Sequence, residues 1–132
     1  KERNEGAILN VASVASLQPG GPLMATYYAS KSFVLTFTEG IREEMRGSNV
    51  RISTLCPGPT MTEFEKMEEI SGTFNKMKTM SAKKVAEIAY RDFSHGKSII
   101  IPGKLNKIAV FFGKFIPRNL ALKIVKKIQE KK

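Results

Sequence analysis

The feature that most constrains how this chain can fold is its repeated order of apolar strand, amphipathic helix and apolar strand. Residues 6–13 form a short apolar run with β-branched members, preceded by charged residues and followed by the loop-forming Gln18-Pro19-Gly20-Gly21-Pro22. A continuous apolar run of this length is typical of a strand that is buried on both faces, as in a parallel sheet.

The later segments continue this alternation. A helix is predicted over 25–46, because Phe33, Phe37, Ile41 and Met45 recur every four residues. Residues 50–55 predict a second strand, 82–93 a second helix behind the N-cap Ser81, and 98–101 a third strand. Helices between strands imply right-handed crossovers and a parallel sheet. We therefore expect an α/β fold, specifically the last three strands of a doubly wound sheet.

Residues 61–79 interrupt this order with a segment rich in Met, Glu and Lys that lacks a clean period. One or two short, mobile helices are expected there. The methionines in and beside it, at 61, 67, 77 and 80, fit either simple packing or a flexible apolar lid.

The positive charge is concentrated at one end of the 132-residue chain, whose formal net charge is +10. Residues 1–102 hold 13 Lys/Arg and 11 Asp/Glu, whereas residues 103–132 hold nine Lys/Arg and a single Glu. The nearly neutral body shows no basic groove for nucleic acid. We divide the chain into an α/β part, 1–103, and a basic, amphipathic helical tail, 104–132.

Two interpretations of the tail remain open. In the first, a helix that begins near Pro117 docks on its own domain and leaves its lysines in water. In the second, a basic amphipathic helix lies on an anionic membrane surface, with Leu120, Ile124, Val125 and Ile128 inserted. The apolar stripe fits both interpretations, and the charge favours the second.

The chain has one cysteine and one histidine, which argues against a disulfide framework and against a metal site. The single Cys56 excludes an internal disulfide framework, so a reducing, cytoplasmic setting is the default. The lone His95 predicts a surface cap and not a metal site, which would need partner ligands. No apolar stretch approaches the length of about 18 residues that spans a bilayer.

The candidate chemistry lies in Ser13, Tyr27 and Lys31. Tyr27 and Lys31 are four residues apart at the start of the long helix, so they share one face. A phenol is a weak acid or base at neutral pH, and a nearby ammonium group favours its phenolate form. Such a tyrosine can exchange a proton with a carbonyl or alcohol oxygen. Ser13 ends the preceding strand, where parallel sheets place their ligands.

Each of these residues alone is weak evidence, since a Tyr-x-x-x-Lys pair commonly sits on a helix surface and a strand-end serine commonly forms a turn. The combination is more specific. It joins Asn10-Val11-Ala12-Ser13, a Gly/Pro loop, Tyr27-Tyr28-Ala29-Ser30-Lys31, and a strand ending in Cys56-Pro57-Gly58-Pro59-Thr60-Met61-Thr62.

This combination, over roughly residues 6–102, resembles the short-chain dehydrogenase/reductase family. The resemblance implies a Rossmann fold and an NAD(P)-dependent oxidoreductase that interconverts a carbonyl and an alcohol, with NADP preferred over NAD as cofactor. It assigns catalysis to Ser13, Tyr27 and Lys31. It assigns cofactor binding to Tyr27, Lys31, Pro57, Gly58 and Thr62, and substrate binding to Ser13. Tyr27 is chosen over Tyr28 because only Tyr27 has a lysine four residues later.

Several segments that the family pattern includes are missing from this sequence, and their absence raises an alternative to the enzyme interpretation. The glycine-rich phosphate loop, the Asn-Ala-Gly strand and the helix with a fourth catalytic residue, an asparagine, are absent from the printed sequence. We therefore expect the C-terminal part of a longer enzyme, inactive by itself and homo-oligomeric when complete. The alternative is a non-catalytic module that acts through its tail. The expected partner is a small carbonyl or alcohol substrate of hydrophobic character, and peripheral membrane contact through the tail is the second expected interaction.

Overall fold

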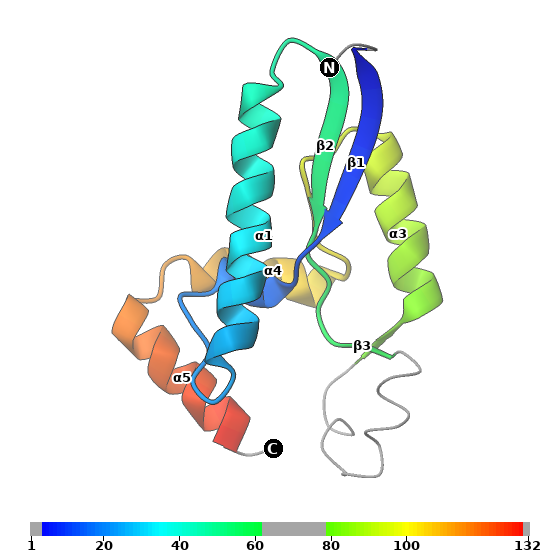
Figure 1. Ribbon diagram of the computed structural model, residues 1–132. Coiled ribbons are helices and arrows are strands. Elements are labelled where there is room, and N and C mark those ends of the chain that lie inside the picture. The colour runs from blue at the N-terminus through cyan, green and yellow to red at the C-terminus, as the bar shows by residue number, and fades with distance from the viewer. Residues whose placement is uncertain (1–3, 62–78, 131–132) are drawn as a thin grey trace.

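The computed structural model describes residues 4–61 and 79–130 as a parallel sheet with helices on both sides (Figure 1). The main sheet has the strand order β1-β2-β5, and both of its strand pairs are parallel. Its strands are β1 (Glu5–Val11), β2 (Asn49–Leu55) and β5 (Ile99–Ile100). The helices are η1 (Val14–Leu17, a 3-10 turn), α1 (Ala25–Glu44), α3 (Ala82–Ser94), α4 (Lys104–Gly113) and α5 (Arg118–Glu130).

Two apolar clusters hold α1 and α3 against opposite faces of this sheet (Figure 1). On the α3 side, Leu55 and Ile100 pack with Val85 and Ala89. On the α1 side, a second cluster joins Leu35 to residues that follow the strands, Ala12 and Cys56. Parallel strands joined by helices on both faces confirm the predicted α/β class.

The strand β1 differs from its prediction. The sequence predicted burial on both faces, but Ile8 is 43% exposed and Val11 is 53% exposed. The reason is position: among the described strands β1 lies at the edge of the sheet and pairs only with β2. An apolar run shows that a strand prefers burial, but not whether a neighbour lies beside it.

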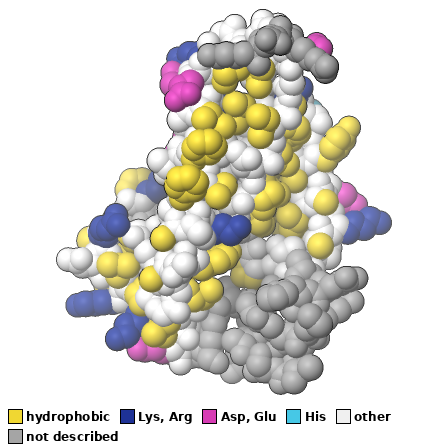
Figure 2. Space-filling model, viewed as in Figure 1, with side chains coloured by type: hydrophobic (Ala, Val, Ile, Leu, Met, Phe, Trp, Pro, Cys, Tyr) yellow, Lys and Arg dark blue, Asp and Glu magenta, His cyan; other side chains and the backbone are white. Residues whose placement is uncertain are grey.

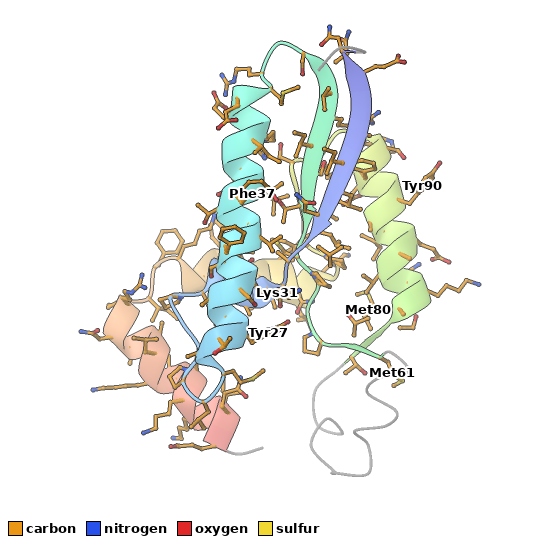
Figure 3. The ribbon with its side chains drawn as sticks, viewed as in Figure 1. Tyr27, Lys31, Phe37, Met61, Met80 and Tyr90 are labelled. Atoms are coloured by element: carbon orange, nitrogen blue, oxygen red, sulfur yellow. The ribbon has the colours of Figure 1, made fainter. Side chains whose placement is uncertain are left out.

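The phenylalanines that recur along α1 could serve either the core or an interface, and they lie on the exposed face of the helix. The sheet-facing side chains are Leu35 and Thr38, and Thr38 accepts a hydrogen bond from Asn10 of β1 at 2.9 Å. Phe33 and Phe37 are both exposed and stack on each other, with ring centroids 5.8 Å apart, and Figure 3 shows Phe37 on α1. The recurring phenylalanines therefore predicted the helix correctly, but they do not belong to its core side.

The segment after β2 forms a second, very short parallel ladder. Strand β3 (Thr60–Met61) pairs with β4 (Met80–Ser81), which directly precedes α3. The prediction of short helices over 61–79 is therefore wrong at Met61. The rest of that segment, with Met67 and Met77, lies outside the described residues.

The C-terminal segment folds back on the start of α1. Val125 of α5 is buried with Ala15 and Tyr28, and Arg118 donates a hydrogen bond to the carbonyl of Pro19 at 2.9 Å. One side of α5 is thus docked on the α/β part. None of the helices in the described ranges is long and apolar enough to cross a membrane.

A close approach of backbone and ring at Gly21 gives a stability prediction. A Cβ atom at Gly21 would overlap the buried ring of Tyr28, whereas one at Gly40 in α1 would meet no atom within 4 Å. Gly21→Ala should therefore lower the free energy of unfolding by about 1–3 kcal/mol through overpacking. Gly40→Ala, the matched control, should raise it by about 0.5–1 kcal/mol because alanine favours helix. Denaturant unfolding of both variants checks this, and equal effects would contradict it.

Candidate active site

Ser13 lies two residues after the end of β1 and is the N-cap of η1. Its hydroxyl accepts a hydrogen bond from the backbone N–H of Ala15 at 3.2 Å and donates to the carbonyl of Pro57 at 3.5 Å. The side chain is almost fully buried. The serine is therefore held at the carboxyl end of the sheet, between the loop that follows β1 and the loop that follows β2.

Tyr27 and Lys31 lie in the first two turns of α1, near the same end of the sheet (Figure 3). The ammonium group of Lys31 donates a hydrogen bond to the carbonyl of Val11, the last residue of β1, at 3.4 Å. It also lies 5.9 Å from the ring centroid of Tyr27. Lys31 thus connects the tyrosine with the strand end that carries Ser13.

The two adjacent tyrosines have different environments. Tyr27 is 40% exposed, whereas Tyr28 is 8% exposed and packs against Ala15 and Val125. Burial raises the pKa of the Tyr28 phenol, and a hydrogen bond with Gln129 of α5 lowers it by less. Tyr28 therefore keeps its proton and serves the contact between α1 and α5, while the Tyr27 ring remains accessible.

The Pro57-Gly58 loop closes the other side of Ser13. The carbonyl of Pro57 accepts a hydrogen bond from the backbone N–H of Val14 at 3.0 Å, in addition to its bond with the serine hydroxyl. Gly58 has no room for a side chain, because a Cβ atom there would overlap the side chain of Asn106. Thr62, the other residue assigned to this loop, lies outside the described residues.

Asn106 was not identified from the sequence. It lies in α4, and its amide donates a hydrogen bond to the carbonyl of Pro102 at 2.8 Å while its side chain fills the space beside Gly58. The only sequence signal was an asparagine four residues after a proline at a helix start. This contact links α4 to the loop beside Ser13.

Cys56 and His95 take no part in this site. Cys56 is fully buried beside Ser16, and burial raises the pKa of its thiol, which disfavours the thiolate that a nucleophile needs. His95 forms the C-cap of α3 and contacts the carbonyl of Arg91, as a surface cap was predicted to do. Within the described ranges, no three metal-ligating side chains gather in one place.

The donor groups present suit one part of a dinucleotide. The Lys31 ammonium group and the Tyr27 hydroxyl carry the hydrogen-bond donors that ribose hydroxyls and a carbonyl oxygen accept. A phosphate-binding loop would need glycines between a strand and a helix N-terminus. The loop before α1 does contain glycines, but Tyr28 fills the space at Gly21 and Leu122 lies close to Gly20. In the part of the chain that the structure describes, the donor groups therefore fit the ribose hydroxyls of a nucleotide, and the glycines before α1 form no phosphate-binding loop.

Comparison with known proteins gives concordant results. The family model described as short chain dehydrogenase matches residues 1–71. An uncharacterized oxidoreductase of Bacillus subtilis (strain 168), YvrD, is 39% identical over 61 residues, which are 46% of this chain and 23% of that protein.

Solved structures show the same fold over nearly the whole chain. A 7beta-hydroxysteroid dehydrogenase structure has a TM-score of 0.77 at 22% identity and covers 94% of this chain and 47% of its own. A short chain dehydrogenase from Burkholderia cenocepacia J2315, in complex with NADP, has a TM-score of 0.71 at 25% identity, with coverages of 90% and 48%. Similar structures in complex with NAD are also known.

These comparisons and the geometry agree on the part of the fold that is present. The chain spans about a quarter of the curated relative that it matches and about half of the similar solved structures. The family match covers more than half of this chain, including β1, the serine and the Tyr-x-x-x-Lys helix. The chain belongs to the short-chain dehydrogenase family.

Proposed function

We propose that this chain is the C-terminal part of an NAD(P)-dependent oxidoreductase that interconverts a carbonyl and an alcohol. The observation that carries the proposal is the position of Lys31. Its ammonium group donates a hydrogen bond to the carbonyl of Val11, two residues before Ser13, and it also lies close to the Tyr27 ring. A cation, a phenol and a hydroxyl at one sheet end form a proton-transfer set for an oxygen-bearing substrate.

In this mechanism each residue has one role at the substrate oxygen. Ser13 orients that oxygen through its hydroxyl, and Tyr27 gives it a proton during reduction or removes one during oxidation. Lys31 places a positive charge beside the Tyr27 ring, which stabilises negative charge that develops on the phenol oxygen, and it holds ribose hydroxyls. The cofactor, when bound, supplies or accepts the hydride at the substrate carbon. In reduction, the carbonyl carbon gains the hydride and the oxygen gains the Tyr27 proton, which balances the reaction.

The bonds of Ser13 allow this role. Its hydroxyl accepts a bond of 3.2 Å from the N–H of Ala15, but its donor bond to the Pro57 carbonyl is 3.5 Å, at the limit for a hydrogen bond. Turning that hydroxyl toward a substrate oxygen therefore gives up little. The bond from Ala15 keeps the serine oxygen in place while its proton changes partner.

For the cofactor we propose NADP or NAD, with NADP preferred. Similar solved structures in complex with each of these nucleotides support the pair. Tyr27 and Lys31 would contact the nicotinamide ribose, and Pro57, Gly58 and Thr62 would line the nicotinamide and pyrophosphate. The residue that distinguishes the two cofactors follows the second strand of a Rossmann fold, which this chain does not contain.

For the substrate we propose a carbonyl compound with a bulky apolar body. Relatives of this chain include proteins named very-long-chain 3-oxoacyl-CoA reductase and 17-beta-hydroxysteroid dehydrogenase type 3. Met61, which follows the Pro-Gly loop, is 48% exposed and offers an apolar surface near the predicted site. The exposed stack of Phe33 and Phe37 further suggests a homo-oligomer that pairs through α1, with burial by the rest of the enzyme as the competing explanation.

A comparison of two protein forms tests this function. The complete enzyme should oxidise NADPH or NADH in the presence of apolar ketones or aldehydes, while the 132-residue chain alone should show no turnover. The reason is that the described residues carry the proton-transfer set but offer no site for the adenine and no glycine-rich loop for the phosphates. Spectrophotometric assays of both forms with the same carbonyl panel measure this.

Either of two results would contradict the proposal. Turnover by the isolated chain at the rate of the complete enzyme would show that the nucleotide site lies within these residues. Absence of turnover by the complete enzyme, with both cofactors and the whole panel, would favour the non-catalytic alternative.

A further inference from the structure

Helix α4 presents an apolar surface that the described structure leaves uncovered. None of its residues is buried, and Phe112 is 62% exposed. At 3.6 residues per turn, Leu105, Ile108 and Phe112 fall on one side of the helix, away from Asn106, which faces the Pro-Gly loop. In the connection to α5, Phe115 is 72% exposed. Large apolar side chains therefore continue across α4 and into the connection.

Helix α5 carries three adjacent strips along its length. The docked strip contains Leu122, which lies close to Gly20, and the buried Val125. The neighbouring strip, further around the helix axis, contains the exposed side chains Leu120, Ile124 and Ile128. Docking of α5 on the body therefore does not use the whole apolar stripe. It leaves an exposed apolar strip that runs the length of the helix.

The third strip of α5 is basic and lies next to the exposed apolar strip, on the side of the helix turned away from the body. It consists of Lys123 and Lys127. Lys126, which pairs with Glu130 at 3.6 Å, lies between this strip and the docked one. Figure 2 shows dark blue side chains beside yellow ones at the lower left, where Figure 1 places α5. Exposed apolar side chains flanked by lysines are typical of helices that lie in the interface of an anionic bilayer.

We propose that α4 and α5 form a peripheral membrane-binding surface for anionic phospholipids. We call this the α4–α5 surface. Leu120, Ile124 and Ile128 enter the headgroup region with the exposed side chains of α4, and Lys123 and Lys127 contact the lipid phosphates. Val125, which the sequence placed in the membrane, stays in the protein core. The membrane and docked interpretations of the tail are thus combined, because different strips of α5 serve each.

The positive charge of the α4–α5 surface favours an anionic bilayer over a second copy of the chain as its binding partner. Residues 103–132 hold nine Lys/Arg and one acidic residue, so two such surfaces would repel each other. An anionic bilayer complements both properties of the surface, since it accepts apolar side chains and attracts lysines. The 13 residues of α5 extend for about 20 Å, and the helix lies along the bilayer plane without crossing it.

Vesicle sedimentation of the complete protein tests the proposal. The protein should pellet with phosphatidylcholine vesicles that contain phosphatidylserine, and much less with phosphatidylcholine alone. Lys123→Gln combined with Lys127→Gln should weaken partitioning about thirtyfold, at about 1 kcal/mol for each lysine. Ile124→Ser should weaken it by about tenfold through loss of apolar burial. Raising salt from 0.1 M to 1 M, where the Debye length falls from about 10 Å to about 3 Å, should release the protein.

Matched controls lie on α3. Tyr90 is an exposed aromatic residue, 75% accessible, that projects from α3 on the other side of the sheet (Figure 3). Tyr90→Ser and Lys83→Gln should leave vesicle binding unchanged. Melting temperatures of all variants show whether each remains folded, which the partial exposure of Ile124 and the lysines predicts.

The outcomes separate the possible occupants. Loss of binding in the α5 variants, with unchanged melting and unchanged controls, supports the α4–α5 surface. Failure of the parent protein to bind anionic vesicles at low salt would overturn the proposal and leave a protein partner or another part of the enzyme as the cover. Binding that survives both α5 changes, or that is equal on neutral vesicles, would also overturn it. Carbonyl reduction in solution is measured separately, so failure here leaves the proposed function intact.

Discussion

Replacing Tyr27 with phenylalanine should lower kcat/KM of the complete enzyme for a carbonyl substrate by about 10²–10⁴-fold, the usual contribution of one acid or base. The substitution keeps the ring and its position beside Lys31 and removes only the group that moves the proton. Because Tyr27 is partly exposed, the melting temperature should stay near that of the parent. Steady-state kinetics together with thermal unfolding measure both effects.

Tyr28→Phe is the matched control, because it removes the same group one residue away. Tyr28 is buried between Ala15 and Val125, and its hydroxyl bonds with Gln129. Its loss should cost about 1 kcal/mol of stability, the net contribution of a typical hydrogen bond, with little change in turnover. If Tyr28→Phe is the variant that loses activity, the proton donor has been assigned to the wrong tyrosine.

The positions of the candidate site residues were predictable because they depend on local rules. A residue four positions after another on a helix must share its face, so Tyr27 and Lys31 had to project together. A residue that follows a parallel strand must lie at the carboxyl end of the sheet, which is where Ser13 is found. The Pro-Gly pair after β2 lies beside Ser13 for the same reason.

Features that depend on distant neighbours were not predictable in the same way. Periodicity identified α1, but it did not show that Thr38 faces the sheet through Asn10 while Phe33 and Phe37 face outward. Hydrophobicity identified β1, but not its edge position in the described sheet. Asn106 was missed because its contact with Gly58 joins residues 48 positions apart, and no local pattern reports such a contact.

The tail shows where one sequence pattern supports two structures at once. Its apolar residues repeat at helical spacing, and that spacing spreads them over two neighbouring strips of α5. Val125 lies on the docked strip and Ile124 on the exposed one, although the two residues are adjacent in sequence. Contacts with the body, from Ala15 and Tyr28 to Val125 and from Gly20 to Leu122, determine which strip of α5 faces inward.

Replacing Lys31 with methionine should weaken cofactor binding and slow the proton-transfer step of the same enzyme together. Hydrogen bonds to charged groups contribute about 1.5–3 kcal/mol, so the dissociation constant for the nucleotide should rise about 10- to 150-fold. Methionine keeps the length and apolar stem of the side chain and removes the cation near the Tyr27 ring. Because negative charge that develops on the Tyr27 oxygen then loses a stabilising cation, kcat for alcohol oxidation at saturating nucleotide should fall as well.

Nucleotide titration by fluorescence and kcat at saturating nucleotide separate the two roles of this one ammonium group. Lys31→Arg is the informative control, since it restores the charge but not the compact ammonium geometry. It should restore most of kcat while leaving nucleotide affinity partly reduced. Lys83→Met, on the exposed side of α3, should change neither measurement. Normal kcat with normal affinity in Lys31→Met would mean that Lys31 only holds the carbonyl of Val11, and its proposed role beside Tyr27 would have to be abandoned.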